Sequence, residues 1–140
     1  MKKHTALLVI IVAIIGCTSA SNKTTIDDFI RIAQSQGWEF EHAEGEPGDN
    51  PRHTYIVAPG EMYITLEQHP DAGSAREVAD DNNVDLEAIK RHVIREGVPL
   101  GEMGRHPQAF AHHNLVMYIP LDYIVYYPEG ETLAAAFLAF

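Results

Sequence analysis

Histidines are the side chains of this sequence best suited to binding a metal, and eight of them occur among its 140 residues. His106, His112 and His113 share one segment, while His42 and His53 flank another that is rich in acids. Neutral imidazoles bind zinc well, but a site needs three or four groups that rigid elements hold together. The adjacent pair would point to opposite sides of a strand, and no two histidines are spaced i, i+4 for a helix. The spacing therefore favours exposed loop histidines and predicts no metal or other cofactor.

Pairs of acidic side chains are the second candidate for chemistry, because a glycosidase uses two carboxyl groups as acid and base. The pairs are Asp80 with Asp81 and Glu129 with Glu131. Catalytic carboxyl groups flank a cleft about 5–9 Å apart, and one of them is shielded from water. In a chain with 20 acidic residues and a net charge of −10, pairs on turns and helix faces are better explained as solvated surface. No nucleophile with a nearby base is visible either, so we expect a protein that is not an enzyme.

Cys17 is the only cysteine, so no disulfide can form within the chain. It follows two lysines, an apolar run over residues 6–15 and the small Gly16, which is the order of a secretory signal. A spanning helix needs about 20 apolar residues, and this run is much shorter. The sequence therefore predicts an export signal that ends at the cysteine.

The four residues "IIGC", 14–17, resemble a bacterial lipobox, at which a signal peptidase cuts before the cysteine. The resemblance implies a signal peptide over residues 1–16, diacylglycerol and acyl chains on Cys17, and a polar tether to residue 24. Several acyl chains, at about 0.8 kcal/mol per buried methylene, make a durable anchor. Thr18 follows the cysteine where an aspartate would retain Gram-negative lipoproteins in the inner membrane, which implies the outer membrane, facing the periplasm. The alternative is an uncleaved signal anchor with an incidental cysteine.

The charge of the chain narrows the possible partners. Removing residues 1–16 would change the net charge from −10 to −12, because Lys2 and Lys3 leave with the signal. Such a surface repels phosphate backbones, so we expect no nucleic acid partner. The remaining length fits one domain.

Residue patterns predict an α+β domain that opens with a helix and a strand. Residues 25–37 form an amphipathic pattern with Thr25 as N-cap and Gly37 at the end. Alternating apolar and polar residues predict strands at 38–43, 53–59 and 62–67. The intervening residues 44–52 are acidic and rich in turn formers, which predicts a solvated loop.

Two short helices and two strands are predicted in the second half. Ser74 and Glu77 have the spacing of a capping box, and Asp85 can cap a second helix that ends at Gly97. Residues 97–114 predict a long loop, because they are rich in glycine and proline, and long loops in small domains are often functional. Residues 115–120 and 123–128 have the β-branched and aromatic composition of strands. We expect the apolar tail, residues 133–140, to pack as a last helical turn over the core or, alternatively, to bind a partner.

The order of elements over residues 54–128 resembles the LysM domain, a small βααβ module that binds N-acetylglucosamine polymers. The segment "YIVAPGE" is similar to its opening strand, "AREVADDNNVDLEAIKRHV" to its two helices, and "IPLDYIVYYP" to its closing strand. Relative to that module, this chain inserts residues 62–73 and expands residues 97–114. The resemblance implies two short helices packed on a small antiparallel sheet, with residues 25–53 as an extension and 129–140 as a tail.

The resemblance also implies a glycan groove, in which backbone amides bond acetamido groups and flat apolar faces stack on sugar rings. Two of the implied residues are tyrosines, Tyr63 and Tyr118, and the alternative is that both are simply half-buried residues of strands. The residues implied as ligand-binding are Gly60, Glu61, Met62 and Tyr63 on one side and Leu115, Val116 and Tyr118 on the other.

These observations together predict a lipid-anchored cell-envelope protein that binds peptidoglycan or another N-acetylglucosamine glycan. The alternative function is an envelope lipoprotein that acts on a partner protein, as an assembly factor or inhibitor, without binding glycan. That alternative would use the segment 97–114 and the apolar tail.

Overall fold

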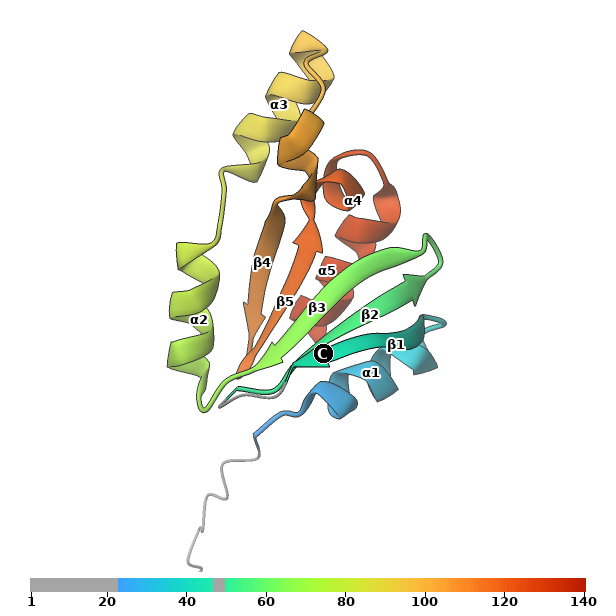
Figure 1. The fold of residues 1–140 in the computed structure, drawn as a ribbon, viewed down its shortest axis with the longest axis vertical. Helices are drawn as coiled ribbons and strands as arrows, with labels where there is room; N and C mark the ends of the chain where they lie inside the picture. The colour runs from blue at the N-terminus through green and yellow to red at the C-terminus, as the bar shows by residue number, and fades with distance from the viewer. Residues whose placement is uncertain (1–22, 47–49) are drawn as a thin grey trace, which may run out of the picture.

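Five antiparallel strands form one sheet, in the order β1-β2-β3-β5-β4, in a computed structural model that describes residues 23–46 and 50–140 (Figure 1). The signal peptide, Cys17 and most of the predicted tether therefore lie outside the described residues. The strands are β1 (Glu39–Glu46), β2 (Arg52–Ala58), β3 (Met62–Gln68), β4 (Pro107–His112) and β5 (Leu115–Pro120). The helices are α1 (Ile26–Ser35), α2 (Ala72–Asp81), α3 (Leu86–Glu96), the 3-10 helix η1 (Gly101–Arg105), α4 (Leu121–Val125) and α5 (Pro128–Ala139). This composition confirms the predicted α+β class.

Helices cover the two faces of the sheet unequally. On one face α1 and α5 enclose the main core, which includes Phe29, Leu66 and Phe137, all fully buried. On the other face α2 packs over β4 and β5, through Ala75 and Ala79, and leaves β1 to β3 uncovered (Figure 1). Strand β5 is buried on both faces, which explains its unbroken apolar sequence.

Strand β1 forms one edge of the sheet, and acidic side chains line it. Glu39, Glu41 and Glu44 are all exposed. The register of β1 against β2 shifts between His42 and Glu44, which marks a β-bulge or irregularity there. The other edge strand, β4, is not left free in this way. Helix α2 packs against it, and the side chain of Gln108 donates a hydrogen bond to the side chain of Asn83.

Helix α1 begins as predicted. The hydroxyl of Thr25 accepts a hydrogen bond from the N–H of Asp28 at 3.1 Å, and the Asp28 carboxylate accepts one from the N–H of Thr25 at 3.0 Å. This reciprocal capping box satisfies two of the backbone donors that a helix start leaves free. Gly37 follows the helix with a φ of 96°, which glycine tolerates better than other residues.

The predicted capping box of the next helix is wrong. The N-cap of α2 is Asp71, whose carboxylate accepts hydrogen bonds from the N–H of Ser74 at 2.8 Å and from its hydroxyl at 3.1 Å. Ser74 is therefore a donor inside the first turn, and the helix starts earlier than its serine suggested. Helix α3 does begin after Asp85, whose side chain accepts from the N–H of Ala88, and it ends at Gly97 in the left-handed conformation.

Acidification is expected to remove the stabilisation that the two capping carboxylates provide. The hydrogen bonds from Thr25 to Asp28, and those from Ser74 to Asp71, hold the pKa of both carboxyl groups below the ordinary value. A lowered pKa in the folded state stabilises the protein above the ordinary carboxyl pKa, and this stabilisation is lost as pH falls through the lowered value. The wild type should therefore lose more free energy of unfolding than the double variant Asp28→Asn/Asp71→Asn between about pH 6 and about pH 3.

Urea denaturation of both proteins at the two pH values measures this difference. Asparagine keeps an oxygen that accepts the capping hydrogen bonds, so the comparison isolates the charge. Equal losses in the wild type and the double variant would contradict the assignment of these carboxylates as ionised caps.

Three predicted segments differ in the structure. Residues 44–46, expected in a loop, continue β1, and the segment 97–114 contains η1, β4 and a two-residue turn to β5. Residues 123–128, expected as a strand, belong mostly to α4 and the start of α5. Helix α4 forms because Leu121 and Ile124, one helical turn apart, both reach the core.

These differences change the topology expected from the LysM resemblance. Strand β2 pairs with β1 and β3, and the segment expected to close the module is helical. Its two strands therefore do not pair with each other. Of the two central helices, α2 packs on β4 and β5, whereas α3 has no fully buried residue and reaches the main core through Leu86.

The apolar tail packs as expected. It forms α5, whose Leu133, Ala134 and Phe137 are buried in the main core. Of its large apolar side chains only Leu138 is strongly exposed. A partner that bound the tail would therefore compete with the core, in which most of the large apolar side chains of the tail are already buried.

Candidate functional site

The seven residues expected to bind a glycan do not form one groove. Met62, Leu115 and Val116 are completely buried in the two cores, and Tyr118 is 8% exposed. Leu115 pairs with Gln68 at the far end of β3 from Tyr63, because the two strands are antiparallel. These four residues are therefore core positions, which corrects the predicted groove. Leu115, Val116 and Tyr118 lie on β5, which is buried on both faces.

The other three predicted residues lie together at the start of β3. Gly60 and Glu61 form the turn from β2, with φ values of 106° and 50°. Tyr63 projects from the uncovered face of the sheet and is 54% exposed. It lines a cavity that the sequence did not reveal.

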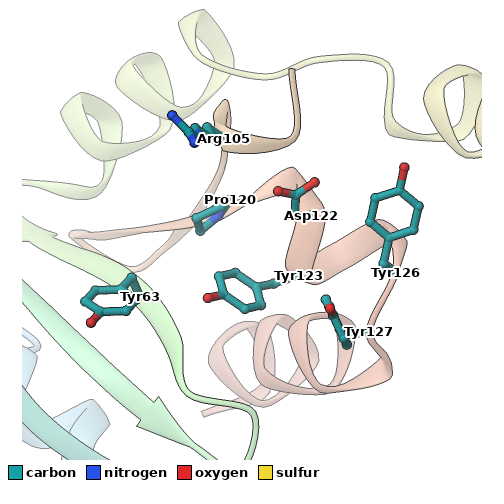
Figure 2. Close-up of a pocket in the computed structure, with 7 residues that line it drawn as sticks. All are labelled: Tyr63, Arg105, Pro120, Asp122, Tyr123, Tyr126 and Tyr127. Atoms are coloured by element: carbon teal, nitrogen blue, oxygen red, sulfur yellow. The ribbon is translucent and has the colours of Figure 1, made fainter. Parts of the chain in front are cut away.

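That cavity, the tyrosine cavity, has a volume of about 530 Å³. It is lined by Tyr63, Arg105, Pro120, Asp122, Tyr123, Tyr126 and Tyr127, which come from β3, η1, β5, α4 and the segment leading to α5 (Figure 2). Its size falls within the range of about 300–1,000 Å³ that is usual for small-molecule sites.

Two hydrogen bonds position tyrosines of this cavity. The hydroxyl of Tyr126 accepts from the N–H of Leu100 at 2.9 Å, and the hydroxyl of Tyr123 donates to the carbonyl of Glu61 at 3.2 Å. The rings of Tyr123 and Tyr127 lie 6.0 Å apart, tilted by 42°. Helix α4 is thereby connected to η1 on one side and to the β2–β3 turn on the other.

Asp122 and Arg105 bring opposite charges to the cavity without neutralising each other. Arg105 is exposed at the end of η1, and it forms no ion pair with any described residue. The Asp122 carboxylate lies directly against Gly104, where a Cβ would overlap it. The absence of a side chain at Gly104 therefore leaves the space that the carboxylate occupies.

This arrangement suits a ligand with flat apolar faces and many hydrogen-bonding groups. Partly exposed tyrosine rings offer faces for stacking and hydroxyls for hydrogen bonds. Carboxylate oxygens accept hydrogen bonds from hydroxyl and amide groups, and a guanidinium donates several. Sugars present both kinds of surface.

Sequence reasoning missed most of the cavity because it assigned the wrong secondary structure to its residues. A strand over residues 123–128 would send Tyr126 and Tyr127 to opposite faces of a sheet. The helical alternative had a signal in the sequence, since Tyr123, Tyr126 and Tyr127 have the i, i+3, i+4 spacing of one helix face.

A second concave surface lies on the segment 86–105, α3 through η1, which we call the arm (Figure 1). No residue of α3 is fully buried, and Ile94, Val98 and Met103 are exposed. A groove of about 520 Å³ runs along the arm. Its lining is almost entirely apolar: Ala88, Ile89, His92, Val93, Val98, Pro99, Leu100 and Met103.

The histidines that prompted the metal hypothesis lie in separate groups. The expectation that the adjacent pair points to opposite sides is wrong, because the ring centroids of His112 and His113 are 4.0 Å apart. His42 and His53 face each other across β1 and β2, with Nε2 and Nδ1 3.2 Å apart, and His112 contacts the carbonyl of Phe140 at 2.7 Å. Within residues 23–46 and 50–140, no three histidine, cysteine, aspartate or glutamate side chains converge as they would around a metal ion.

The acidic pairs are not arranged around a cleft. Asp80 and Asp81 are exposed at the end of α2. Glu129 and Glu131 lie in the first turn of α5, where Glu131 contacts the ammonium group of Lys90.

In the part of the chain that the structure describes, no helix has the length and apolar character needed to span a bilayer. Comparisons with protein-family models, curated proteins and solved structures found no match to this chain.

Proposed function

We propose that this chain is a lipid-anchored cell-envelope protein that binds an N-acetylated glycan such as peptidoglycan, without acting on it as an enzyme. The observation that carries the proposal is the tyrosine cavity, which is lined by four tyrosines, one carboxylate and one guanidinium. A neutral sugar has no charge to attract, so its binding relies on stacked rings and convergent hydrogen bonds.

The distribution of exposed apolar side chains supports a binding role at this end of the molecule. Seven large apolar residues are exposed among those described: Tyr63, Ile94, Val98, Met103, Tyr126, Tyr127 and Leu138. Three of them line the tyrosine cavity and three lie on the arm. Exposed apolar side chains that gather in this way usually mark an interaction surface, whereas isolated ones do not.

The position of the described N-terminus fits a lipid anchor behind this surface. Lys23 lies beside Asp71 and Asn114. The start of α2 and the β4–β5 turn, to which these residues belong, are at the end of the long axis opposite α3 (Figure 1). Six residue steps separate Lys23 from Cys17, which can span at most about 20 Å. Lipidation at Cys17 would thus leave the arm and the tyrosine cavity pointing away from the membrane.

Loss of the tyrosine rings is expected to abolish glycan binding. In the double variant Tyr63→Ala/Tyr127→Ala, two half-exposed rings are removed, and each lost stacking contact should weaken binding about tenfold. The measurement is co-sedimentation of full-length protein, purified in detergent, with insoluble peptidoglycan.

Leu138→Ala is the control, because it removes an equally exposed apolar side chain outside the cavity. Wild-type protein and this control should sediment with the glycan, whereas the double variant should stay in solution. Wild-type protein that remains wholly in the supernatant would overturn the proposal.

The lipid anchor has its own test. Intact-mass spectrometry of the protein extracted from membranes should find residues 1–16 removed and Cys17 carrying a diacylglyceryl group. The variant Cys17→Ser should retain its signal peptide and its full mass. An unmodified thiol in the native protein would contradict the anchor.

The groove on the arm favours a second candidate function, the docking of an envelope protein. Within residues 86–105, Lys90, Arg91, Arg95 and Arg105 outnumber Glu87, Glu96 and Glu102, although the whole chain has a net charge of −10. An apolar groove on a segment with a slight excess of basic residues fits a partner segment with apolar anchors and flanking acids.

A photo-crosslinker at Val98 should then give one adduct of defined mass in cells. Reversing the charges of two exposed residues on α3, with Arg91→Glu/Arg95→Glu, should abolish that adduct, whereas Tyr63→Ala/Tyr127→Ala should leave it intact. A crosslinker at Leu138 is the control. An adduct that forms equally there, or that survives charge reversal, would contradict docking at the arm.

A further inference from the structure

We propose that the tyrosine cavity selects glycans that carry a carboxylate, and that Arg105 is the residue that recognises it. This inference rests on the proposed glycan-binding function and adds the chemical class of the ligand. In peptidoglycan the carboxylate has two possible sources: the lactyl group of a muramic sugar whose peptide has been removed, or the peptide stem.

Arg105 lines the tyrosine cavity (Figure 2), so a ligand in the cavity can reach its guanidinium. It is exposed, and none of the described carboxylates lies within ion-pair distance of it. A guanidinium is planar and presents paired N–H groups that match the two oxygens of a carboxylate. A second carboxylate brought by a ligand can therefore bind without displacing an internal partner.

The net negative charge of the molecule makes the position of Arg105 in this cavity informative. The chain has 20 acidic residues and 10 basic ones, so most of its surface repels an acidic ligand. Arg105 is the cation in a cavity whose lining also includes four tyrosines. A site for neutral sugars alone would need no such cation, because hydroxyl and amide groups suffice for them.

Asp122 has a different role in the same cavity. Its carboxylate lies against Gly104, and no described residue donates a hydrogen bond to it among the contacts of the structure. It can accept hydrogen bonds from sugar hydroxyls or an acetamido N–H, which neutral and acidic glycans both possess. Asp122 should therefore contribute to binding of neutral and acidic ligands alike, whereas Arg105 should make the acidic ligand bind more tightly.

Four disaccharide probes separate these contributions when their affinities for full-length protein are measured by isothermal titration calorimetry. The first is chitobiose, which is neutral. The second is N-acetylglucosaminyl-N-acetylmuramic acid with a free lactyl carboxylate, and the third is its methyl ester. The fourth carries an alanyl-glutamate dipeptide, so that its lactyl group is an amide and its carboxylates lie on the peptide.

The wild type should bind at least one of the acidic probes, the second or the fourth, about tenfold more tightly than the ester. The tighter of the two identifies the source of the carboxylate. Arg105→Gln should abolish this preference, so that the acidic probes bind no more tightly than the ester, whereas Asp122→Asn should weaken all four probes. Arg95→Gln, which removes a cation of the arm outside the cavity, should change none of these affinities.

Equal binding of the acidic probes and the ester by the wild type would overturn this inference and leave the proposed glycan binding intact. The ester comparison needs no variant, so it decides the question even if Arg105→Gln fails to fold, which circular dichroism would reveal. Absence of binding to all four probes would overturn the proposed function, and this inference with it.

Discussion

Alanine in place of Phe137 is expected to lower the free energy of unfolding by about 3–5 kcal/mol. Phe137 is fully buried in the main core, where its ring meets that of Phe29 edge-on at 5.1 Å between centroids. It also contacts the rings of His112 and Phe140. The substitution removes these contacts and leaves a cavity between α5, α1 and the sheet. Domains of this size are stable by about 5–15 kcal/mol, so most of the margin is lost.

Leu138→Ala is the matched control, because it changes the next residue of the same helix and its side chain is 47% exposed. It should alter the free energy of unfolding by less than about 1 kcal/mol. Chemical denaturation of both variants measures the difference. Similar values for the two would contradict the burial of the C-terminal helix. The result also bears on partner experiments, since deleting residues 133–140 removes core side chains along with any binding surface.

Alanine in place of Gly130 is expected to destabilise the protein by about 2–4 kcal/mol, although the same change in an exposed helix is favourable by about 1 kcal/mol. Gly130 is buried in the first turn of α5, and a Cβ there would overlap the backbone carbonyl of Tyr123. Backbone atoms cannot rotate aside as a side chain can, so α4 and α5 must separate. Because α4 carries Tyr123 and Asp122, the variant should also lose glycan binding.

Gly73→Ala is the control for this prediction. Gly73 is also helical, but a Cβ there would meet only the side-chain oxygen of Asp71, at 3.1 Å. A side chain can yield by a few tenths of an ångström, so we expect a change within about 0.5 kcal/mol. Thermal denaturation of both variants tests the contrast. A Gly130→Ala protein as stable as the control would contradict the close packing of α4 on α5.

Local signals in the sequence identified several elements correctly because the residues that define them act over short distances. Thr25 caps α1 through a hydrogen bond to the residue three positions later, and Asp85 caps α3 in the same way. Strand β3 was predicted from its alternating apolar and polar residues, and strand β5 from its composition, since β-branched and aromatic residues fit a pleated surface.

The elements that were missed depend on contacts with distant parts of the chain. The composition of α4 favours a strand, but burial of Leu121 and Ile124 against the core holds it helical. The hairpin from β4 to β5 turns at His113 and Asn114, and His113 has a φ of 53° without being glycine. Two-residue hairpin turns usually contain a glycine, so this turn lacks the residue by which it would have been predicted.

The candidate site was predictable only at Tyr63. The cavity assembles β3, η1 and α4, whose residues Tyr63, Arg105 and Asp122 are far apart in sequence. Their proximity follows from β5 pairing beside β3 and from the helical turn after Pro120. The spacing of the tyrosines indicates the helical turn, but the pairing of β5 with β3 has no local sequence signal, so spacing alone could not place a guanidinium and a carboxylate beside these rings.

The glutamates along β1 oppose the pairing of two copies of the chain through this edge of the sheet. An unpaired strand edge is a template for another strand, and unprotected edges allow proteins to polymerise into fibres. Two copies that approached through β1 would bring Glu39 and Glu41 against the same residues of the neighbour, and like charges opposite each other oppose pairing. Even at the high local concentration of a crowded surface, neighbouring copies should remain separate particles.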